Sequence, residues 1–314
     1  MKASTFTYKG GDGAEIFARL WRPEEPPKAT VQIVHGKAEH SARYAPFAQF
    51  LTGQGFAVYA NDLRGHGETA KSERDLGYFA DRDGWELVVE DLFALSERIR
   101  KELPGLPLFL LGHSMGTPLA RCYIARHGGL SGCILSGTIG HPGLLGLVGR
   151  SLVEREIKKV GAHTPSRKLE NLAGGSFNKQ FRPARTEFDW ISRDTAVVDA
   201  YVADPRCGFV AQAGFYRDLL AVVLAANGAA CVSATPRELP LLFITGERDP
   251  VGANGKKVRA VIRRFERAGL RDVSARFYPG ARHECLNEMG REEVYRDILS
   301  WMTAHLDRQE SVRR

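Results

Sequence analysis

Short apolar segments alternate with amphipathic segments in the N-terminal part of the chain, and this alternation limits the fold more than any other feature. The strand-like runs lie around Phe6 and at positions 16–21, 30–34, 56–60, 108–111 and 133–135. Helical spacing of apolar residues occurs at 41–52, where Ser41 is the expected N-cap, and at 85–100 and 115–126. Strands that alternate with helices predict right-handed crossovers and a mostly parallel sheet with helices on both faces.

A long segment without a strand pattern interrupts this alternation. Between 138 and 236 the chain has helical stretches, loops and many charges. Strand patterns return at 241–245 and 273–278, and helical patterns return at 255–268 and 292–306. We therefore predict an α/β core built from residues 1–137 and 237–314, with residues 138–236 inserted as a helical cap. Open α/β sheets bind ligands at the carboxyl ends of their strands, where we expect this cap to lie.

The pentapeptide at 112–116, Gly-His-Ser-Met-Gly, fits the pattern Gly-x-Ser-x-Gly, in which the serine occupies a sharp turn between a strand and a helix. Larger side chains two residues from the serine would clash in so tight a turn. An apolar run precedes this pentapeptide and a helical pattern follows it, as the motif requires. We therefore predict Ser114 as a catalytic nucleophile.

A serine nucleophile needs a base to take its proton and an acid to orient that base. Where this motif occurs, both follow the serine in the chain, with the acid first. The strand end at 136–138 has no carboxylate, whereas the strand end at 246–250 has two, and we favour Asp249 over Glu247. His283 follows the last predicted strand, so its position in the chain order makes it the expected base.

Hydrogen-bond donors must also stabilise the negative oxygen of the tetrahedral intermediate. We predict two backbone N–H groups: that of Met115, directly after the nucleophile, and that of Lys37, in the turn after the first parallel strand. His35, His66 and His113 lie in turn motifs, where we expect them to hold loops by hydrogen bonds.

Several longer segments resemble one branch of a known superfamily. They are 35–44 (HGKAEHSARY), 61–67 (NDLRGHG), 112–116 (GHSMG), 188–194 (FDWISRD), 204–209 (DPRCGF), 246–250 (GERDP) and 281–288 (ARHECLNE). Together they resemble the monoglyceride lipase and bacterial lysophospholipase branch of the α/β hydrolases, over nearly the whole chain. The resemblance implies an α/β-hydrolase fold with a helical cap, no cofactor, and hydrolysis of carboxylic esters that carry one fatty acyl chain.

Lys37 departs from this resemblance, because a small or apolar residue is expected at its position. An ammonium group that reached the site could accept an anionic head group of the substrate. Alternatively, only the backbone N–H of Lys37 acts there and the side chain points elsewhere.

Composition and cysteine spacing limit the partners. The chain is 43% hydrophobic and 26% charged, which is typical of a soluble globular enzyme. Its five cysteines form no Cys-x-x-Cys pair and no zinc-ligand spacing, so we expect reduced, mostly buried thiols and no metal. The net charge of +7 is not accompanied by any nucleic-acid-binding motif. No membrane-span-length apolar run and no signal-peptide pattern are present, which predicts a cytoplasmic protein.

The first helix predicted within the cap is amphipathic and basic. Between 141 and 185, nine Lys or Arg stand against three Glu. From Leu144 onward, one helical side is expected to carry Leu145, Val148, Leu152, Val153, Ile157 and Val160. One interpretation is a cap helix packed on its own core. The other is a doorway for acyl chains, with basic residues that draw it transiently to anionic membrane surfaces.

The leading functional hypothesis is a monoacylglycerol esterase, and a lysophospholipase is the second. The same triad serves peptidases and thioesterases, because the fold does not determine the substrate. A peptidase cap is expected to carry acidic residues that bind a substrate amine, and this cap is basic. A dehalogenase would have Asp at position 114, and a non-catalytic receptor would have lost the triad. Oligomeric state, acyl-chain length and head-group preference are not encoded in these motifs.

Overall fold

One eight-stranded sheet forms the centre of the protein. The computed structural model describes residues 2–313, except for the side chains of Leu144, Leu145, Leu147 and 308–313. The strand order is β1-β2-β4-β3-β5-β6-β7-β8. The strands are β1 (Lys2–Lys9), β2 (Glu15–Arg22), β3 (Ala29–Val34), β4 (Phe56–Asn61), β5 (Leu108–His113), β6 (Gly132–Ser136), β7 (Leu241–Gly246) and β8 (Val273–Tyr278). Only the β1–β2 and β2–β4 pairs are antiparallel, so the prediction of a mostly parallel sheet is confirmed.

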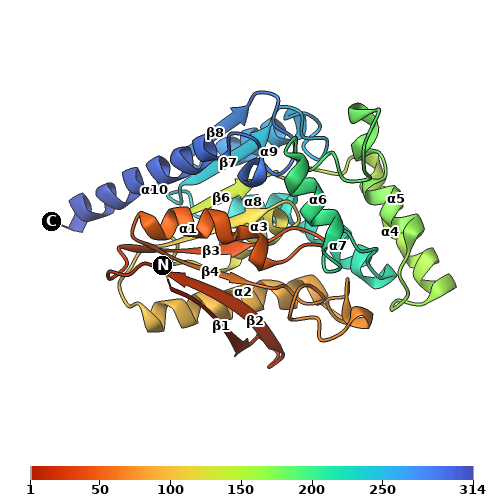
Figure 1. The fold of residues 1–314 in the computed structure, drawn as a ribbon, viewed down its shortest axis with the longest axis horizontal. Coiled ribbons are helices and arrows are strands. Elements are labelled where there is room, and N and C mark those ends of the chain that lie inside the picture. Colours follow the sequence, from red (N-terminus) through yellow and green to blue (C-terminus); the bar gives the residue numbers. More distant parts are fainter. Residues whose placement is uncertain (1, 314) are drawn as a thin grey trace.

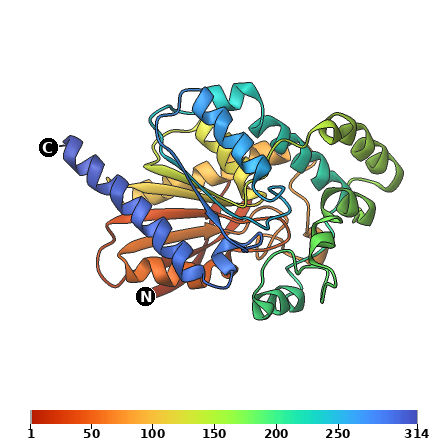
Figure 2. The same ribbon diagram turned by 90° about the horizontal axis from the view of Figure 1, so that it is seen from above.

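Helices cover both faces of this sheet (Figures 1 and 2). On one face, α1 (Ala45–Gly53) and α10 (Arg291–Arg313) contribute to one apolar cluster with the central strands. On the other face, α2 (Gly84–Glu102), α3 (Gly116–Arg126) and α9 (Lys256–Arg267) contribute to a second cluster. Every residue of β3, β4 and β5 is buried, as expected for strands whose two faces are both covered.

The predicted start of the first helix at Ser41 is wrong. Residues Ser41–Tyr44 form a short 3-10 helix, and the α-helix α1 begins at Ala45 with Pro46 in its first turn. The Ser41 hydroxyl has no hydrogen-bond partner, while its backbone N–H donates to the carboxylate of Asp62. Proline suits the first turn of a helix because its missing N–H is not needed there. The helix start is therefore fixed by Pro46 rather than by a serine cap.

The segment between β6 and β7 is helical. It contains α4 (Leu144–Val160), α5 (Arg167–Gly174), α6 (Thr195–Ala203), α7 (Ala213–Ala226) and α8 (Ala229–Ala234). Its one isolated bridge pairs Pro165 with Gln212, and no strand occurs among its described residues. Helices α4 to α7 lie at one end of the molecule, and the N- and C-terminal ends of the chain lie on the opposite side (Figures 1 and 2).

Helix α4 packs with a narrower face than the sequence predicts. Val153 is buried, and Ile157 and Val160 pack partly against the same core cluster. Val148 is 54% exposed, so its predicted place on the packed side is wrong. At about 100° per residue, Val148 is turned about 140° from Val153 around the helix axis. Leu145, also predicted on this side, has its side chain outside the described part of the structure.

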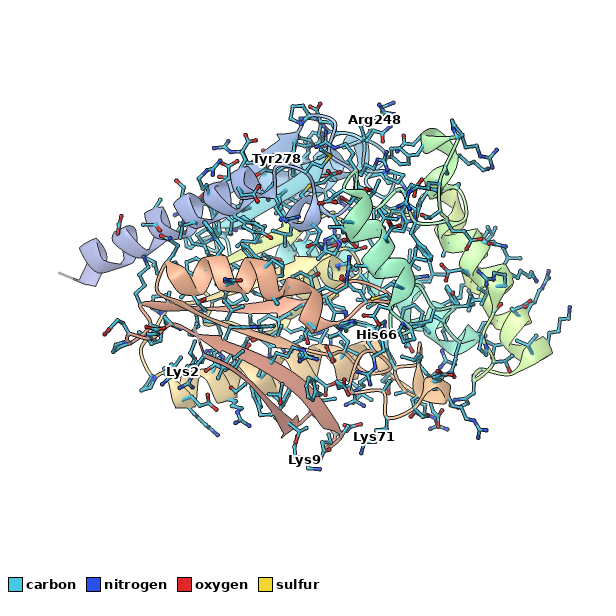
Figure 3. All side chains as sticks on the ribbon, in the orientation of Figure 1. Lys2, Lys9, His66, Lys71, Arg248 and Tyr278 are labelled. Atoms are coloured by element: carbon cyan, nitrogen blue, oxygen red, sulfur yellow. The ribbon has the colours of Figure 1, made fainter. Side chains whose placement is uncertain are left out.

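The exposed lysines and the buried histidine labelled in Figure 3 show how charged and neutral polar residues are distributed. Lys2 and Lys9 at the two ends of β1, and Lys71, lie at the periphery, whereas His66 lies among the buried loops (Figure 3). Among residues 2–313, no helix is both long and apolar enough to cross a membrane.

Candidate functional site: a buried Asp–His pair beside a strained serine

Ser114 occupies a strained turn between β5 and α3. Its φ angle is 50°, in the left-handed region that few residues other than glycine adopt. A Cβ atom at Gly112 would lie 2.5 Å from the carbonyl oxygen of Gly116, and one at Gly116 would lie 2.2 Å from the carbonyl oxygen of Val34. Both glycines are therefore required by close backbone contacts. The strand–turn–helix context predicted for this pentapeptide is confirmed.

His283 and Asp249 form a buried pair. The Nδ1 atom of His283 lies 3.0 Å from Oδ1 of Asp249, and the two residues are 2% and 0% exposed. The same oxygen also accepts the backbone N–H of Val251. Because a carboxylate can only accept, Nδ1 carries the proton of a neutral His283 and Nε2 carries the lone pair. By contrast, Glu247 is exposed, so of the two predicted carboxylates only Asp249 contacts this histidine.

Ser114 and His283 lie against the same turn. The backbone N–H of Ser114 donates to the carbonyl of Ser136 at the end of β6. A Cβ atom on the next residue, Gly137, would lie 2.8 Å from Cε1 of His283, the ring atom bonded to Nε2. The ring of His113, which precedes the serine, lies 4.9 Å from the ring of His283. The structure thus gathers Ser114, Asp249 and His283 where β5, β7 and β8 end.

Protein groups enclose His283 but leave one ring nitrogen without a partner. Its Nε2 atom is buried and forms no hydrogen bond with the described residues. The Trp190 ring lies 5.1 Å from its ring, and the Trp190 carbonyl accepts its backbone N–H. Burial opposes a charge on His283, but the adjacent Asp249 carboxylate, together with Glu284 and Glu39, outweighs burial and raises the pKa of this histidine. The pair therefore favours a proton on His283 once one arrives.

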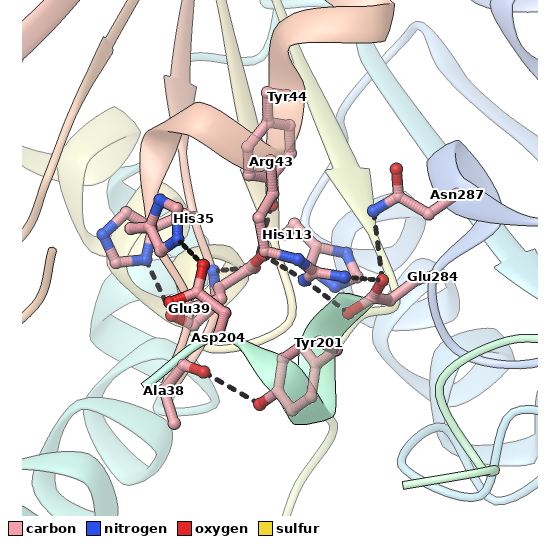
Figure 4. Close-up of polar contacts among 12 residues, drawn as sticks. His35, Ala38, Glu39, Arg43, Tyr44, His113, Tyr201, Asp204, Glu284 and Asn287 are labelled. Carbon is pink, nitrogen blue, oxygen red and sulfur yellow. Dashed lines mark hydrogen bonds and ion pairs between the residues drawn. The ribbon is translucent and has the colours of Figure 1, made fainter. Parts of the chain in front are cut away.

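A buried network joins the loop after β3 to the loop that carries His283 (Figure 4). Arg43 forms two hydrogen bonds with Glu284, at 2.7 and 2.8 Å, and one with Glu39, at 2.6 Å. Glu39 in turn accepts the backbone N–H of Gly36 at 2.6 Å. Burial alone would raise the pKa of Glu39, but Arg43 and neighbouring histidines lower it to about 2. The network therefore holds both loops through charged hydrogen bonds.

The two backbone N–H groups predicted as oxyanion donors, those of Lys37 and Met115, have no hydrogen-bond partner among the described residues. The ammonium group of Lys37 is held by the carboxylate of Glu170 on α5, outside the core. The side chain thus points toward the helical segment.

His35 and His66 hold loops by hydrogen bonds, as predicted, and Nδ1 of His113 lies 3.3 Å from the hydroxyl oxygen of Ser136 at the end of β6. His35 donates from Nδ1 to the Gly36 carbonyl and accepts the Leu63 N–H at Nε2. His66 donates to the Arg64 carbonyl. Burial lowers the pKa of His66 to about 3, and burial together with His283 lowers the pKa of His113 to about 4. These rings therefore stay neutral near pH 7.

Comparison with known proteins gives the family. The family described as "Serine aminopeptidase, S33" matches residues 25–290. The chain belongs to this family of α/β hydrolases. A monoacylglycerol lipase of Mycolicibacterium smegmatis is 33% identical to it over 96% of this chain and 98% of the relative. The human monoglyceride lipase is 28% identical over 93% of this chain and 88% of the relative.

Solved structures agree with this assignment. A thermostable carboxyl esterase from Bacillus coagulans, crystallised with glycerol, superposes on this hydrolase with a TM-score of 0.89. The two chains are 31% identical, and the match covers 98% of this chain and 99% of the esterase. The predicted α/β-hydrolase fold and the predicted family resemblance are both confirmed.

One cluster of metal-ligating side chains exists among the described residues of the hydrolase. Donor atoms of His40, Asp204 and Cys207 lie within 4.8 Å of one another. His40 already forms a 2.8 Å hydrogen bond with Asp204, and burial raises the pKa of Cys207. A protonated thiol and a satisfied carboxylate bind metal poorly. The cluster serves instead as a contact between the loop after β3 and the helical segment.

Sequence reasoning missed Arg43, Glu39 and Glu284. Each lies inside a segment that carried the family resemblance, but no local pattern indicated that a residue near position 40 would meet one near position 284. The signal that could have found them is that they are charged residues in segments expected to be buried. A charged side chain is rarely buried without a partner, so each of them should have indicated an ion pair.

Proposed function

We propose that this hydrolase cleaves carboxylic esters of single fatty acyl chains, with monoacylglycerols as its main substrate class. Ser114 would be the nucleophile, His283 the base, and Asp249 the group that orients the base. The observation that carries the proposal is a buried Asp249–His283 pair with a free Nε2, set beside a serine in a left-handed turn. The relatives named as monoacylglycerol and monoglyceride lipases supply the substrate class.

The first half of the reaction would form an acyl-enzyme. The Ser114 hydroxyl oxygen attacks the ester carbonyl carbon while its proton passes to Nε2 of His283. The N–H groups of Lys37 and Met115 bind the resulting oxyanion, each worth a few kcal/mol. The intermediate then collapses, the bond to the glycerol oxygen breaks, and that oxygen takes the proton from His283.

Water would complete the cycle. His283, neutral again, accepts a proton from water, whose oxygen attacks the acyl carbon attached to Ser114. The second tetrahedral intermediate uses the same two N–H donors. Its collapse returns the proton to the serine oxygen and releases the fatty acid. This sequence needs no cofactor, because each proton moves between substrate, water, serine and histidine.

The charges around the site favour neutral esters over peptides. An aminopeptidase needs an unpaired carboxylate to bind the substrate amine. Around the loop after β3, Glu39, Glu170 and Glu284 are each paired with Lys37 or Arg43, and Asp204 is paired with His40. Lysophospholipids remain the second substrate class, because they present the same single acyl ester with an anionic phosphate in the head group.

A hydrolysis panel tests the proposal. We expect turnover of monoacylglycerols and of p-nitrophenyl esters, weaker turnover of lysophospholipids, and none of aminoacyl amides. A fluorophosphonate should label the protein, and Ser114→Ala should abolish both labelling and turnover while the circular dichroism spectrum stays unchanged. Faster cleavage of aminoacyl amides than of esters would overturn the assignment of substrate class.

We further propose that residues 138–236 act as a cap that meets the lipid surface. Helix α4 exposes Arg150, Arg155, Lys158 and Lys159, and each exposed cation adds up to about 1 kcal/mol of attraction to an anionic membrane. The reducing cytoplasm is the proposed compartment, in keeping with five free cysteines.

Anionic vesicles test this surface contact. They should raise turnover of a long-chain monoacylglycerol but not of a soluble short-chain ester, and added salt should weaken the gain. Replacing Arg155, Lys158 and Lys159 by Gln should remove it. The matched control replaces three exposed lysines elsewhere, Lys2, Lys9 and Lys71, with the same loss of charge. Equal effects of the two triple variants would contradict a contact through α4.

A further inference from the structure

The side chain of Lys37 connects the loop after β3 to two helices of the helical segment between β6 and β7, residues 138–236, which we call the insertion. Its ammonium group binds both carboxylate oxygens of Glu170 on α5. The hydroxyl of Tyr216 on α7 donates to the same carboxylate, and the Tyr216 ring centre lies 5.7 Å from the ammonium nitrogen. The side chains of Lys37 and Glu170 are only 22% and 24% exposed. We call these three residues the Lys37 cluster.

Helix α5 has few other attachments to the core. Leu169 is its one buried residue, and Leu172 is 47% exposed. The hydroxyl of its N-cap, Ser166, and the ammonium group of Lys168 both donate to the carboxylate of Glu156 on α4, within the insertion. The Lys37 cluster is therefore the main polar contact that holds α5 against the loop after β3.

The next residue in this loop is strained and is also held by the insertion. Ala38 has a φ of 52°, a conformation that costs an alanine roughly 1–2 kcal/mol. Its carbonyl accepts the hydroxyl of Tyr201 on α6 at 2.8 Å and the N–H of Gly208 at 2.9 Å. Contacts from the insertion thus offset the strain, and without them Ala38 would relax toward an ordinary φ.

We propose that the Lys37 cluster couples the position of the insertion to the oxyanion donors. Lys37 is then a positioning residue through its side chain, while its N–H is the proposed donor. With the insertion in place, the Lys37 cluster and the contacts of Tyr201 and Gly208 keep Ala38 at its positive φ, in the loop conformation that leaves the N–H of Lys37 without a protein partner. When the insertion moves away and breaks these contacts, the loop relaxes and the N–H turns from the site. This inference rests on the proposed function, because it requires ester hydrolysis through that donor.

Substitutions in the cluster test this coupling with a soluble short-chain ester. Lys37→Met keeps the length of the side chain and removes the charge, and Glu170→Gln removes the other charge. We expect each to lower kcat about tenfold with KM within about twofold, a smaller loss than deleting an oxyanion donor outright causes. The double variant should be no slower than either single variant, because both break the same contact. Lys37→Arg keeps the ion pair and should retain most of kcat.

An inhibitor that forms an oxyanion gives a second measurement. A trifluoromethyl ketone adds to the serine and places a negative oxygen against the same donors. Its affinity should fall about tenfold in Lys37→Met and in Glu170→Gln. The matched control is Lys168→Met, which removes a Lys–Glu pair from the same helix without touching the core. This control should keep both kcat and inhibitor affinity.

Three results would overturn the coupling. They are equal losses in Lys37→Met and Lys168→Met, additive losses in the double variant, and a rise in KM confined to anionic substrates. The last result would mean that the ammonium group binds a substrate head group. If the unmutated protein hydrolyses no ester, the proposed function itself fails. If it hydrolyses esters and Lys37→Met is unchanged in kcat and inhibitor affinity, only this inference fails.

Discussion

Replacing Arg43 by Met should destabilise the protein more than any surface ion-pair substitution, because it leaves two buried carboxylates without their cation. The side chain of Arg43 is 11% exposed, and those of Glu39 and Glu284 are 3% and 5% exposed. Removing one partner of a buried pair costs about 3–5 kcal/mol. The pKa of Glu39 agrees in direction. Burial alone would raise it, but Arg43, together with His113 and His35, lowers it from 4.5 to about 2, so the folded protein favours the charged carboxylate.

Urea unfolding followed by tryptophan fluorescence measures this loss, and the control is Arg271→Met. Arg271 pairs with Glu238 at 2.7 Å, but the two side chains are 72% and 71% exposed. An exposed pair contributes at most about 1 kcal/mol. We therefore expect the midpoint to shift strongly in Arg43→Met and little in Arg271→Met. Equal shifts would refute the argument that burial sets the size of the loss.

The same variant should respond to acid in a defined direction. A carboxylate whose pKa is lowered by folding stabilises the protein above its unfolded pKa, and this contribution disappears as pH falls through the folded value. For Glu39 the window runs from pH 4.5 down to about 2. Arg43→Met lacks this contribution, so the difference in stability between it and the unmutated protein should narrow across that window. A constant difference would mean that Glu39 is not the group involved.

Three further predictions concern the site. Asp249 raises the pKa of His283, and the proposed base must be neutral, so kcat/KM should fall as pH decreases, with an inflection above pH 6.5. An inflection below pH 6.5 would contradict this. Asp249→Asn should lower kcat roughly 10⁴-fold, whereas Glu247→Gln, at an exposed position, should stay near the unmutated rate. Bulky maleimides should inhibit only weakly, because Cys207 and Cys285 are buried and burial raises the pKa of both thiols. Rapid inactivation of the unmutated protein that is absent in Cys285→Ser would contradict this prediction.

The features that the sequence predicted best depend on local patterns. The strand at 273–278 has the predicted limits, and the helix predicted at 115–126 begins one residue later, at Gly116. The serine turn was predictable because its glycines and flanking periodicity lie within a few residues of one another. The fixed chain order of this fold then pointed to Asp249 and His283.

The features that could not be predicted from the sequence depend on contacts between distant segments. Arg43 and Glu284 are separated by 241 positions, and Lys37 and Glu170 by 133. Helical periodicity placed Val148 on an apolar face, but the width of that face depends on how α7 packs against α4. For the same reason, the contact between Lys37 and Glu170 could not be predicted from the sequence.

The insertion also affects the order in which the chain can assemble. Strands β6 and β7 are neighbours in the sheet, yet roughly a hundred residues separate Ser136 from Leu241. Closing a loop of that length costs roughly 2 kcal/mol more entropy than closing one of ten residues. Pairing of β6 with β7 therefore becomes easier once α4 to α8 have formed and shortened the connection. Because Asp249 and His283 lie beyond β7, a ribosome-bound chain that ends within the insertion contains Ser114 but neither of them. If the proposed triad is correct, hydrolytic activity arises only after β7 and β8 have joined the sheet.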